Sequence, residues 1–232
     1  MMKFVSSKII VGGFNMIGIP IALLAANGVE WYLHKYALHG VPQEGGGRKS
    51  ISPPFMKRHW AHHKQVRLSK YRDDYLYGTE NEDAAAEKKA LLQICAVTTL
   101  AMPIAPFFTL TAYYCAWNYW HVHSQSHLDP EWGKKKIPWH YDHHMNTNQD
   151  ANWGVTKPWF DYIMGTRVIS SPDLQESNPL GIKLPRFIEN KLNALARRYV
   201  PRAFEKLDAN MLEEKQKRAQ GLENVMPEFQ AA

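Results

Sequence analysis

The stretch His59-Trp60-Ala61-His62-His63 decides how this chain folds, because its spacing returns in His140-Tyr141-Asp142-His143-His144. Three histidines at positions i, i+3 and i+4 share one face of a helix. Each stretch is therefore predicted to be a helix that presents three imidazoles in one direction. An isolated cluster of this kind is often a surface accident, so the remaining histidines decide its meaning.

A third cluster, His123-Ser-Gln-Ser-His127, places two histidines four residues apart, on one helical face. His121 precedes His123 by two residues, so on the same helix it points to nearly the opposite side. We predict that His123 and His127 act together and that His121 is a spare.

The fourth cluster, His34-Lys-Tyr-Ala-Leu-His39, has a less regular spacing. Five residues correspond to about 140° around an α-helix, so the two rings would diverge on a regular helix. They can converge only if the last turn unwinds or carries a π-bulge, and Gly40 and Pro42 fit a helix end there.

All eleven histidines lie between His34 and His144, which indicates a metal site rather than scattered surface residues. Imidazole suits zinc, copper, iron and nickel. One ion takes about four to six ligands, so the clustered histidines are too many for one ion and about enough for two. A haem would use two axial ligands and leave the other histidines unexplained. The predicted metal ligands, which are also the predicted catalytic residues, are His34, His39, His59, His62, His63, His123, His127, His140, His143 and His144. Their spacing leaves open which histidine serves which ion.

An apolar segment precedes the first cluster. Ile9 to Val29 contains 21 residues without Asp, Glu, Lys or Arg, and about 20 such residues span a bilayer core as a helix. Lys3 and Lys8 before the segment would also suit a signal peptide, but the apolar part of a signal peptide has only about 7–15 residues. We expect a membrane helix that is not removed.

A second uncharged segment runs for thirty residues, from Leu91 to Trp120, and is interrupted by Met102-Pro-Ile-Ala-Pro106. Two prolines so close together indicate a kink or turn. All clusters must reach one site, so this segment must enter the membrane and return. At about 45 Å of helix it is too short for two crossings of a ~30 Å core. We predict a shallow or re-entrant hairpin that turns near Met102 to Pro106.

Basic residues flank these apolar segments at Lys57 to Arg72, Lys134 to Lys136 and Lys191 to Lys217, and the formal net charge is +6. Such flanks are typical of contact with anionic lipid headgroups, not of a nucleic-acid interface, and they place the site at the cytoplasmic face. Two cysteines, Cys95 and Cys115, form no disulfide framework, in keeping with a reducing cytosol.

The predicted fold class is all-α, with integral membrane helices and a histidine-rich dimetal helical cap at the cytosolic face. Residues 1–169 are predicted to form the membrane-embedded catalytic domain, and residues 170–232 a polar, amphipathic helical tail.

The order HX4H, HX2HH, HX3H, HX2HH resembles that of the fatty acid hydroxylase/sterol desaturase superfamily. Three stretches strengthen the resemblance: Glu30 to His39, Asn152-Trp-Gly-Val-Thr156 and Trp159 to Thr166. The resemblance covers roughly Val29 to Arg167. Its third cluster and the Gly-Val-Thr segment favour the fatty acid 2-hydroxylase-like branch, whereas the string from His34 to Gly40 is also similar to carotenoid ring hydroxylases.

The resemblance implies an O2-dependent lipid hydroxylase with two iron ions, although zinc could replace iron in purified protein. A fused cytochrome b5 domain, frequent in eukaryotic relatives, does not accompany this sequence, so a separate ferredoxin or cytochrome b5 type donor would supply electrons. Asp142 and Asp161 could orient ligand imidazoles, and a surface or cap role is equally open to Asp142. The residues that could line an acyl groove are Trp60, Phe107, Phe108, Tyr113, Tyr114, Trp117 and Trp120.

Two other functions stay open. A desaturase of the same superfamily would use a similar histidine set but remove two hydrogens. A non-catalytic metal-binding membrane protein would hold zinc and show no O2 chemistry. The lipid itself stays open among fatty acids, ceramide-like lipids, aminolipids, sterols and carotenoids.

Overall fold

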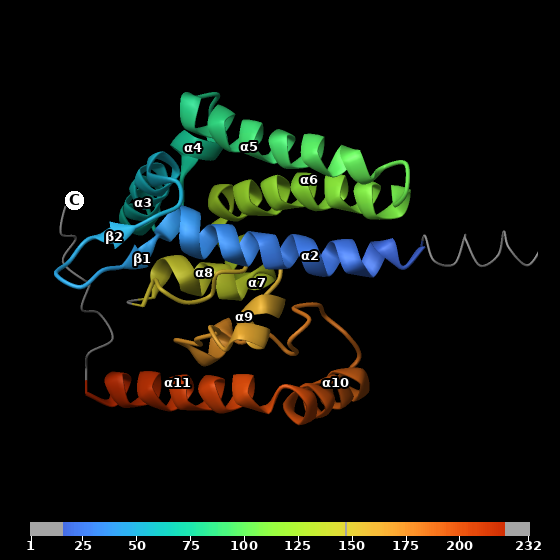
Figure 1. Ribbon diagram of the computed structural model, residues 1–232. Helices are drawn as coiled ribbons and strands as arrows, with labels where there is room; N and C mark the ends of the chain where they lie inside the picture. Colours follow the sequence, from blue (N-terminus) through green and yellow to red (C-terminus); the bar gives the residue numbers. More distant parts are fainter. Residues whose placement is uncertain (1–15, 147, 221–232) are drawn as a thin grey trace, which may run out of the picture.

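The computed structural model describes residues 16–146 and 148–220, and these residues are mostly helical (Figure 1). This confirms the predicted helical fold class. The α-helices are α2 (Gly18–Leu33), α3 (Pro53–Leu68), α4 (Asp74–Gly78), α5 (Glu82–Thr98), α6 (Pro106–Leu128), α7 (Pro130–Lys136), α8 (Pro138–Met145), α9 (Trp159–Met164), α10 (Arg186–Tyr199) and α11 (Pro201–Ala219). Two-residue strands β1 (Val41–Pro42) and β2 (Arg48–Lys49) pair antiparallel.

Local sequence signals set several helix starts. Prolines occupy the first turn of α3, α6, α7 and α8, where a missing N–H costs no hydrogen bond. Side chains cap other starts: Asp73 accepts a hydrogen bond from the Leu76 N–H at α4, and Asn81 accepts one from the Ala84 N–H at α5. Three of the helices that carry histidine clusters, α3, α6 and α8, therefore begin where the sequence places proline.

Helices α5 and α6 form an antiparallel hairpin, and α2 packs along α6 (Figure 1). A short 3-10 turn, η2 (Thr99–Ala101), and residues 102–105 join the two arms, which confirms the predicted return near Met102 to Pro106. The Thr109 hydroxyl donates to the Thr98 carbonyl at 3.2 Å and ties the arms together near the turn. Gly18 allows close approach of α2, since a Cβ there would lie 2.9 Å from the Phe108 nitrogen.

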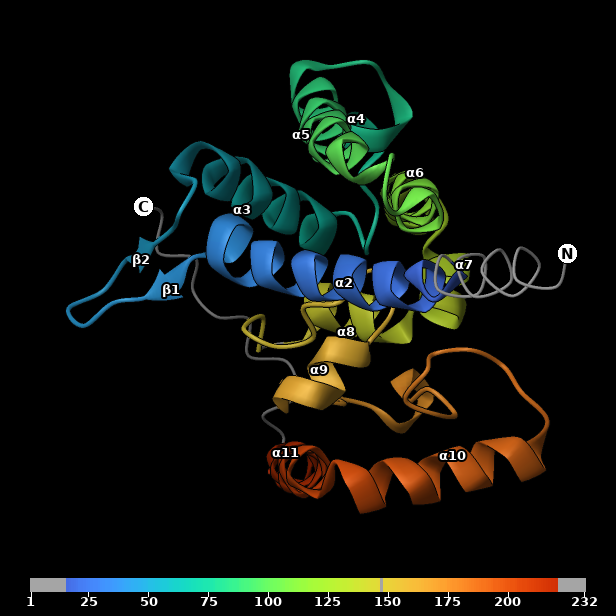
Figure 2. The same cartoon turned by 45° about the vertical axis from the view of Figure 1, so that its right-hand side comes forward.

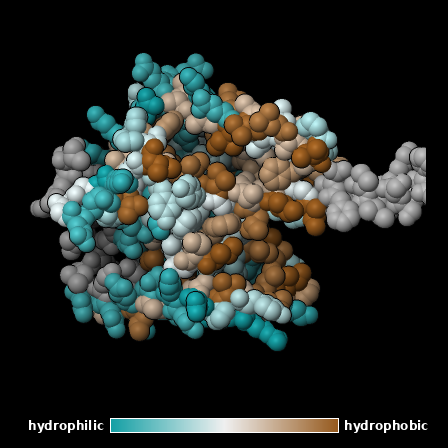
Figure 3. Space-filling model, in the orientation of Figure 1, coloured by the Kyte–Doolittle hydropathy of each residue, from teal (hydrophilic) through white to brown (hydrophobic). Residues whose placement is uncertain are grey.

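Within residues 16–146 and 148–220, no helix combines the length and the apolar character that crossing a bilayer requires. The predicted membrane helix, residues 9–29, lies partly outside the described residues, which begin at 16. Figure 3 shows hydrophobic residues gathered on the half of the molecule where α2 begins and the α5–α6 hairpin turns. Exposed apolar side chains of these elements are Ile21 and Leu24 of α2 and Val97, Leu100 and Ile104 near the turn.

A π-helix, η1 (His34–His39), continues α2 and ends at Gly40, whose φ is 69°. This confirms the predicted irregular turn. A side chain at Gly40 would be strained by the positive φ, and its Cβ would lie 2.9 Å from the Lys49 carbonyl oxygen.

The C-terminal helices lie on the opposite side of α8 and α9 from the hairpin (Figure 2). Phe204 and Leu207 of α11 pack with Tyr162 of α9 and with Ile169 in a small buried cluster. The connection before α10 contains a 3-10 turn, η3 (Pro172–Leu174). A domain boundary at residue 169 stays a prediction.

Candidate metal centre

Nine of the ten predicted ligands come together in two buried groups, each with one ring nitrogen per histidine within 4.8 Å of the others. The groups draw on the π-helix η1 and on helices α3, α6 and α8. We call the first group site A, which contains His34, His39, His59, His63 and His143. We call the second group site B, which contains His62, His123, His127 and His144.

Spacing within each helix separates the two sites. On α3, the i, i+4 pair His59 and His63 belongs to site A, whereas His62 belongs to site B. On α8, the adjacent residues His143 and His144 are divided in the same way. The sequence left this assignment open, because neighbouring residues on a helix diverge by about 100° and only the packing of the helices decides what each one faces.

His140 lies beside site B without belonging to either group. Its ring is fully buried, and its Nε2 lies 3.3 Å from the Nε2 of His127. Its role as a ligand stays a prediction.

Backbone carbonyls fix the orientation of several rings. The Nδ1–H of His34 donates to the Trp153 oxygen at 2.7 Å, and that of His143 donates to the Ala151 oxygen at 2.6 Å. A carbonyl only accepts hydrogen bonds, so Nδ1 must carry the proton. The Nε2 lone pair of each neutral ring is then directed at the other histidines, as a metal ligand requires.

The residues fit a cation at site A because acceptor nitrogens face one another there. The Nε2 of His34 lies 3.0 Å from that of His59, and the Nε2 of His143 lies 3.1 Å from that of His39 and 3.2 Å from that of His63. Lone pairs at these separations repel one another unless a proton or a cation lies between them.

Site B also fits a cation, because several of its ring nitrogens are buried without a hydrogen-bond partner in the part of the chain that the structure describes. The Nε2 of His62 and both ring nitrogens of His144 are buried and have no hydrogen-bond partner among the described residues. A buried polar atom without a partner is costly, so these nitrogens indicate a ligand between them.

Burial lowers the pKa of nearly every clustered histidine. Desolvation is the largest cause at His34, His63 and His144, where the pKa falls well below its usual value, and neighbouring imidazoles lower it further. At His143 desolvation lowers the pKa to about 3. The imidazoles whose pKa is lowered are therefore neutral at physiological pH, in the form that binds metal.

Three side chains that the sequence did not single out contact ligand rings. The Nδ1–H of His62 donates to Asp73 at 2.7 Å, and the Nδ1–H of His63 donates to the Gln149 side-chain oxygen at 2.6 Å. Tyr77 reaches the Nδ1 of His123 with its hydroxyl at 2.9 Å. The acidic stretch after residue 72 was the one signal for Asp73, whereas nothing in the pattern distinguished Gln149.

Of the two roles left open for Asp142, the orientation of an imidazole is wrong, and a surface role is also excluded. Asp142 is fully buried, but its carboxylate accepts from the Ser170 N–H at 3.0 Å and lies 3.4 Å from Arg167. Among the described residues, these partners and the Ser170 hydroxyl use its oxygens, and no histidine does. Asp142 therefore stabilises the segment after α9.

Asp161 supports the ligand His34 indirectly, through a backbone peptide group. Its carboxylate accepts from the backbone N–H groups of Trp153 and Gly154, both at 2.8 Å, and from the Thr166 hydroxyl at 2.7 Å. The direct contact that we predicted is therefore replaced by an indirect one, because Asp161 holds the Trp153 peptide whose oxygen orients His34.

Glu30 holds the same loop from α2. Its carboxylate accepts from the Val155 N–H, from the Thr156 N–H at 2.9 Å and from the Thr156 hydroxyl at 2.8 Å. Burial raises the pKa of Glu30 to about 7 against these hydrogen bonds, which lower it. The glutamate one helical turn before His34 thus fixes the segment that orients His34.

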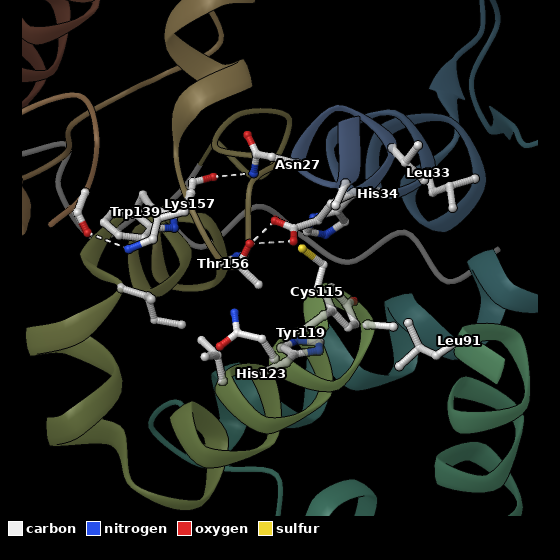
Figure 4. Close-up of a pocket in the computed structure, with 18 of the residues that line it drawn as sticks. Asn27, Leu33, His34, Leu91, Cys115, Tyr119, His123, Trp139, Thr156 and Lys157 are labelled. Carbon is white, nitrogen blue, oxygen red and sulfur yellow. Dashed lines mark hydrogen bonds between the residues drawn. The ribbon is translucent and has the colours of Figure 1, made fainter. Parts of the chain in front are cut away.

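A cleft of about 2070 Å³ opens beside both sites (Figure 4). Its walls include His34 and His59 of site A and His62 and His123 of site B. The predicted groove residues Phe108 and Tyr114 line it. The other predicted groove residues lie outside its lining; these are Trp60, Phe107, Tyr113, Trp117 and Trp120.

His121 should be separable from its neighbour His123. The structure confirms that His121 points away, since its ring is exposed and stacks on Trp117 at 5.2 Å with an angle of 3°. His121→Ala is therefore expected to keep wild-type metal content and activity, whereas His123→Ala should lose metal from site B. Metal analysis of both purified variants tests this, and equal losses would contradict the assignment.

The comparisons with known proteins agree with this geometry. The sequence model of the fatty acid hydroxylase family matches residues 19–166, which contain both sites. No curated protein and no solved structure matches the chain. Because the match covers more than half of the sequence, the chain belongs to the fatty acid hydroxylase family, an oxygenase family within the fatty acid hydroxylase/sterol desaturase superfamily.

Proposed function

We propose that this chain is an O2-dependent hydroxylase that holds two iron ions and inserts oxygen into a lipid C–H bond. The observation that carries the proposal is the position of sites A and B, which both contribute histidines to the wall of one large cleft. A substrate in this cleft would lie beside both ions. Other walls are apolar, with Leu33 from α2, Leu91 from α5 and Phe108 from α6.

Two bound iron ions would supply activation of O2 for attack on an unreactive C–H bond. The protein's own share is binding and positioning. The ligand rings donate hydrogen bonds to the Trp153 and Ala151 carbonyl oxygens and to the Gln149 side-chain oxygen. These bonds hold the rings in place, which lowers the cost of reorganisation when ions bind. Apolar walls position a hydrocarbon chain and exclude water from the reacting carbon.

We further propose that the protein works at a membrane, with its sites at the cytoplasmic face. The exposed apolar side chains of α2 and the α5–α6 turn would enter the bilayer and leave the histidine-bearing ends of the helices outside. Exposed apolar patches rarely stay in contact with water in soluble proteins.

Electrons would come from a separate ferredoxin or cytochrome b5 type protein. The sequence contains no Cys-x-x-Cys and no Gly-x-Gly-x-x-Gly, so it carries neither an iron–sulfur nor a dinucleotide-binding signature of these kinds.

The test uses purified protein reconstituted with a ferredoxin or cytochrome b5 reducing system, membrane lipids and labelled O2. We expect mass spectrometry to find one labelled oxygen atom in a new hydroxyl group. An unlabelled double bond would make the chain a desaturase, the alternative within the same superfamily. Firmly held zinc without any lipid product, even after iron loading, would indicate a non-catalytic metal-binding protein.

A further inference from the structure

The cleft carries a group of basic side chains that hydroxylation of a hydrocarbon does not require. They come from the end of α7, the segment after α8, the segment before α10 and the first residue of α10: Lys134, Lys135, Lys136, Lys157, Lys183 and Arg186. We call this group the basic end. Two of its lysines contact the connection that precedes α10: Lys134 pairs with Asp173 at 2.9 Å, and the Lys157 ammonium donates to the Gly181 oxygen at 2.9 Å.

Carboxylates of the same region neutralise the basic end only in part. Asp173 pairs with Lys134, whereas Glu176 is held by the buried Arg167 at 2.7 Å. At longer range, Glu189 attracts Arg186 and Glu30 attracts Lys157. Glu189 accepts from the Ser177 hydroxyl at 2.6 Å and from the Leu184 N–H at 3.1 Å. Among the described residues, no carboxylate lies within ion-pair distance of Lys135, Lys136, Lys157, Lys183 or Arg186.

Lys157 occupies a fixed place in the wall. Its main-chain oxygen accepts from the Asn27 side chain at 2.8 Å, and its neighbour Thr156 is held by Glu30. The ammonium has three N–H donors, and the structure gives it one acceptor, the Gly181 oxygen. The remaining donors are available to a group inside the cleft.

The histidines lie between the basic end and the apolar walls. In Figure 4, Lys157 and Trp139 lie on one side of the cleft and Leu33 and Leu91 on the other. His34 and His123 lie between them in this view. A molecule that spans the cleft would therefore have a charged end and an apolar end, with the metal sites beside its middle.

We propose that the substrate is a lipid with a terminal phosphate, which binds at Lys157, Lys183 and Arg186 and extends its chain past the histidines toward α5. This rests on the proposed function and names the substrate class for that site. A terminal phosphate carries nearly two charges at neutral pH and three acceptor oxygens, which matches several unpaired cations better than one carboxylate does. Arg186 adds a planar fork of donors that suits phosphate.

The test measures binding, which requires no turnover. Full-length protein in a neutral detergent is titrated calorimetrically with dodecyl phosphate, dodecanoate and dodecanol. We expect dodecyl phosphate to bind roughly tenfold more tightly than the other two, and less tightly as salt is raised. The double variant Lys183→Gln/Arg186→Gln should lose most of this preference and keep the weak binding of dodecanol.

A matched control removes the same charges elsewhere. Lys191 and Arg202 are exposed and do not line the cleft, so Lys191→Gln/Arg202→Gln should bind dodecyl phosphate as the wild type does. The proposal is overturned if the three ligands bind equally well, if dodecanoate binds as tightly as dodecyl phosphate, or if both double variants behave alike. It is also overturned if inorganic phosphate displaces dodecyl phosphate at equal concentration, because the site would then take a free ion.

The outcomes separate this inference from the proposed function. Phosphate-dependent binding without any hydroxylated product would contradict only the proposed function. Hydroxylation of a lipid that is bound without preference for phosphate would contradict only the basic-end proposal.

Discussion

Replacing His143 by alanine is expected to reduce the metal content from about two ions per chain to about one and to lower hydroxylation by more than about 100-fold. The Nε2 of His143 faces those of both His39 and His63, so its loss opens the centre of site A. His144→Ala should instead empty site B. Metal analysis of detergent-purified protein, together with the labelled-O2 assay, measures both effects.

His121→Ala is the matched control, because it removes an exposed histidine from the same chain. A reproducible ratio of one ion in the wild type, with single-ligand variants unchanged, would refute a two-ion centre. If His143→Ala and His144→Ala each lost both ions, the two groups would not bind independently.

Replacing Arg167 by alanine is expected to destabilise the fold by about 3–5 kcal/mol, because a buried ion pair would lose one partner. Arg167 is 1% exposed and lies 2.7 Å from Glu176 and 3.4 Å from Asp142. It also donates to the Leu174 oxygen at 2.9 Å. Without its guanidinium, two buried carboxylates have no countercharge. Urea unfolding followed by circular dichroism measures the change in the free energy of unfolding.

Arg197 provides the control, because it pairs with Asp208 at the surface, with both side chains 53% exposed. Exposed pairs contribute at most about 1 kcal/mol, so Arg197→Ala should have little effect. Equal destabilisation by the two substitutions would mean that the Arg167 network does not hold the segments around α9 together.

Local patterns were enough to predict the helices that carry the histidines. The i, i+3, i+4 spacing of α3 and α8, the irregular turn after His34 and the return near Pro106 all depend on neighbours in the sequence. The structure confirms each of these predictions, because each feature is set by residues that are close together in the sequence.

Contacts between distant residues could not be read from the sequence. Gln149 orients His63 across 86 residues, and no local pattern marks an amide for that role. Asp142, in contrast, lies within a histidine cluster, yet it serves Arg167 and Ser170 because its side chain leaves the helix on a different face from the ligands. Sequence proximity to a ligand was therefore a poor guide to contact with it.

The π-helix from His34 to His39 makes the geometry of site A depend on the number of residues between these two histidines. A wider turn holds one residue more than an α-helical turn, and that residue brings the two rings to a centroid distance of 5.0 Å. Deleting a single residue between them would leave two histidines four residues apart, which share a face only if the segment becomes an ordinary α-helix. The number of residues in this segment and the width of its turn can therefore change during evolution only together.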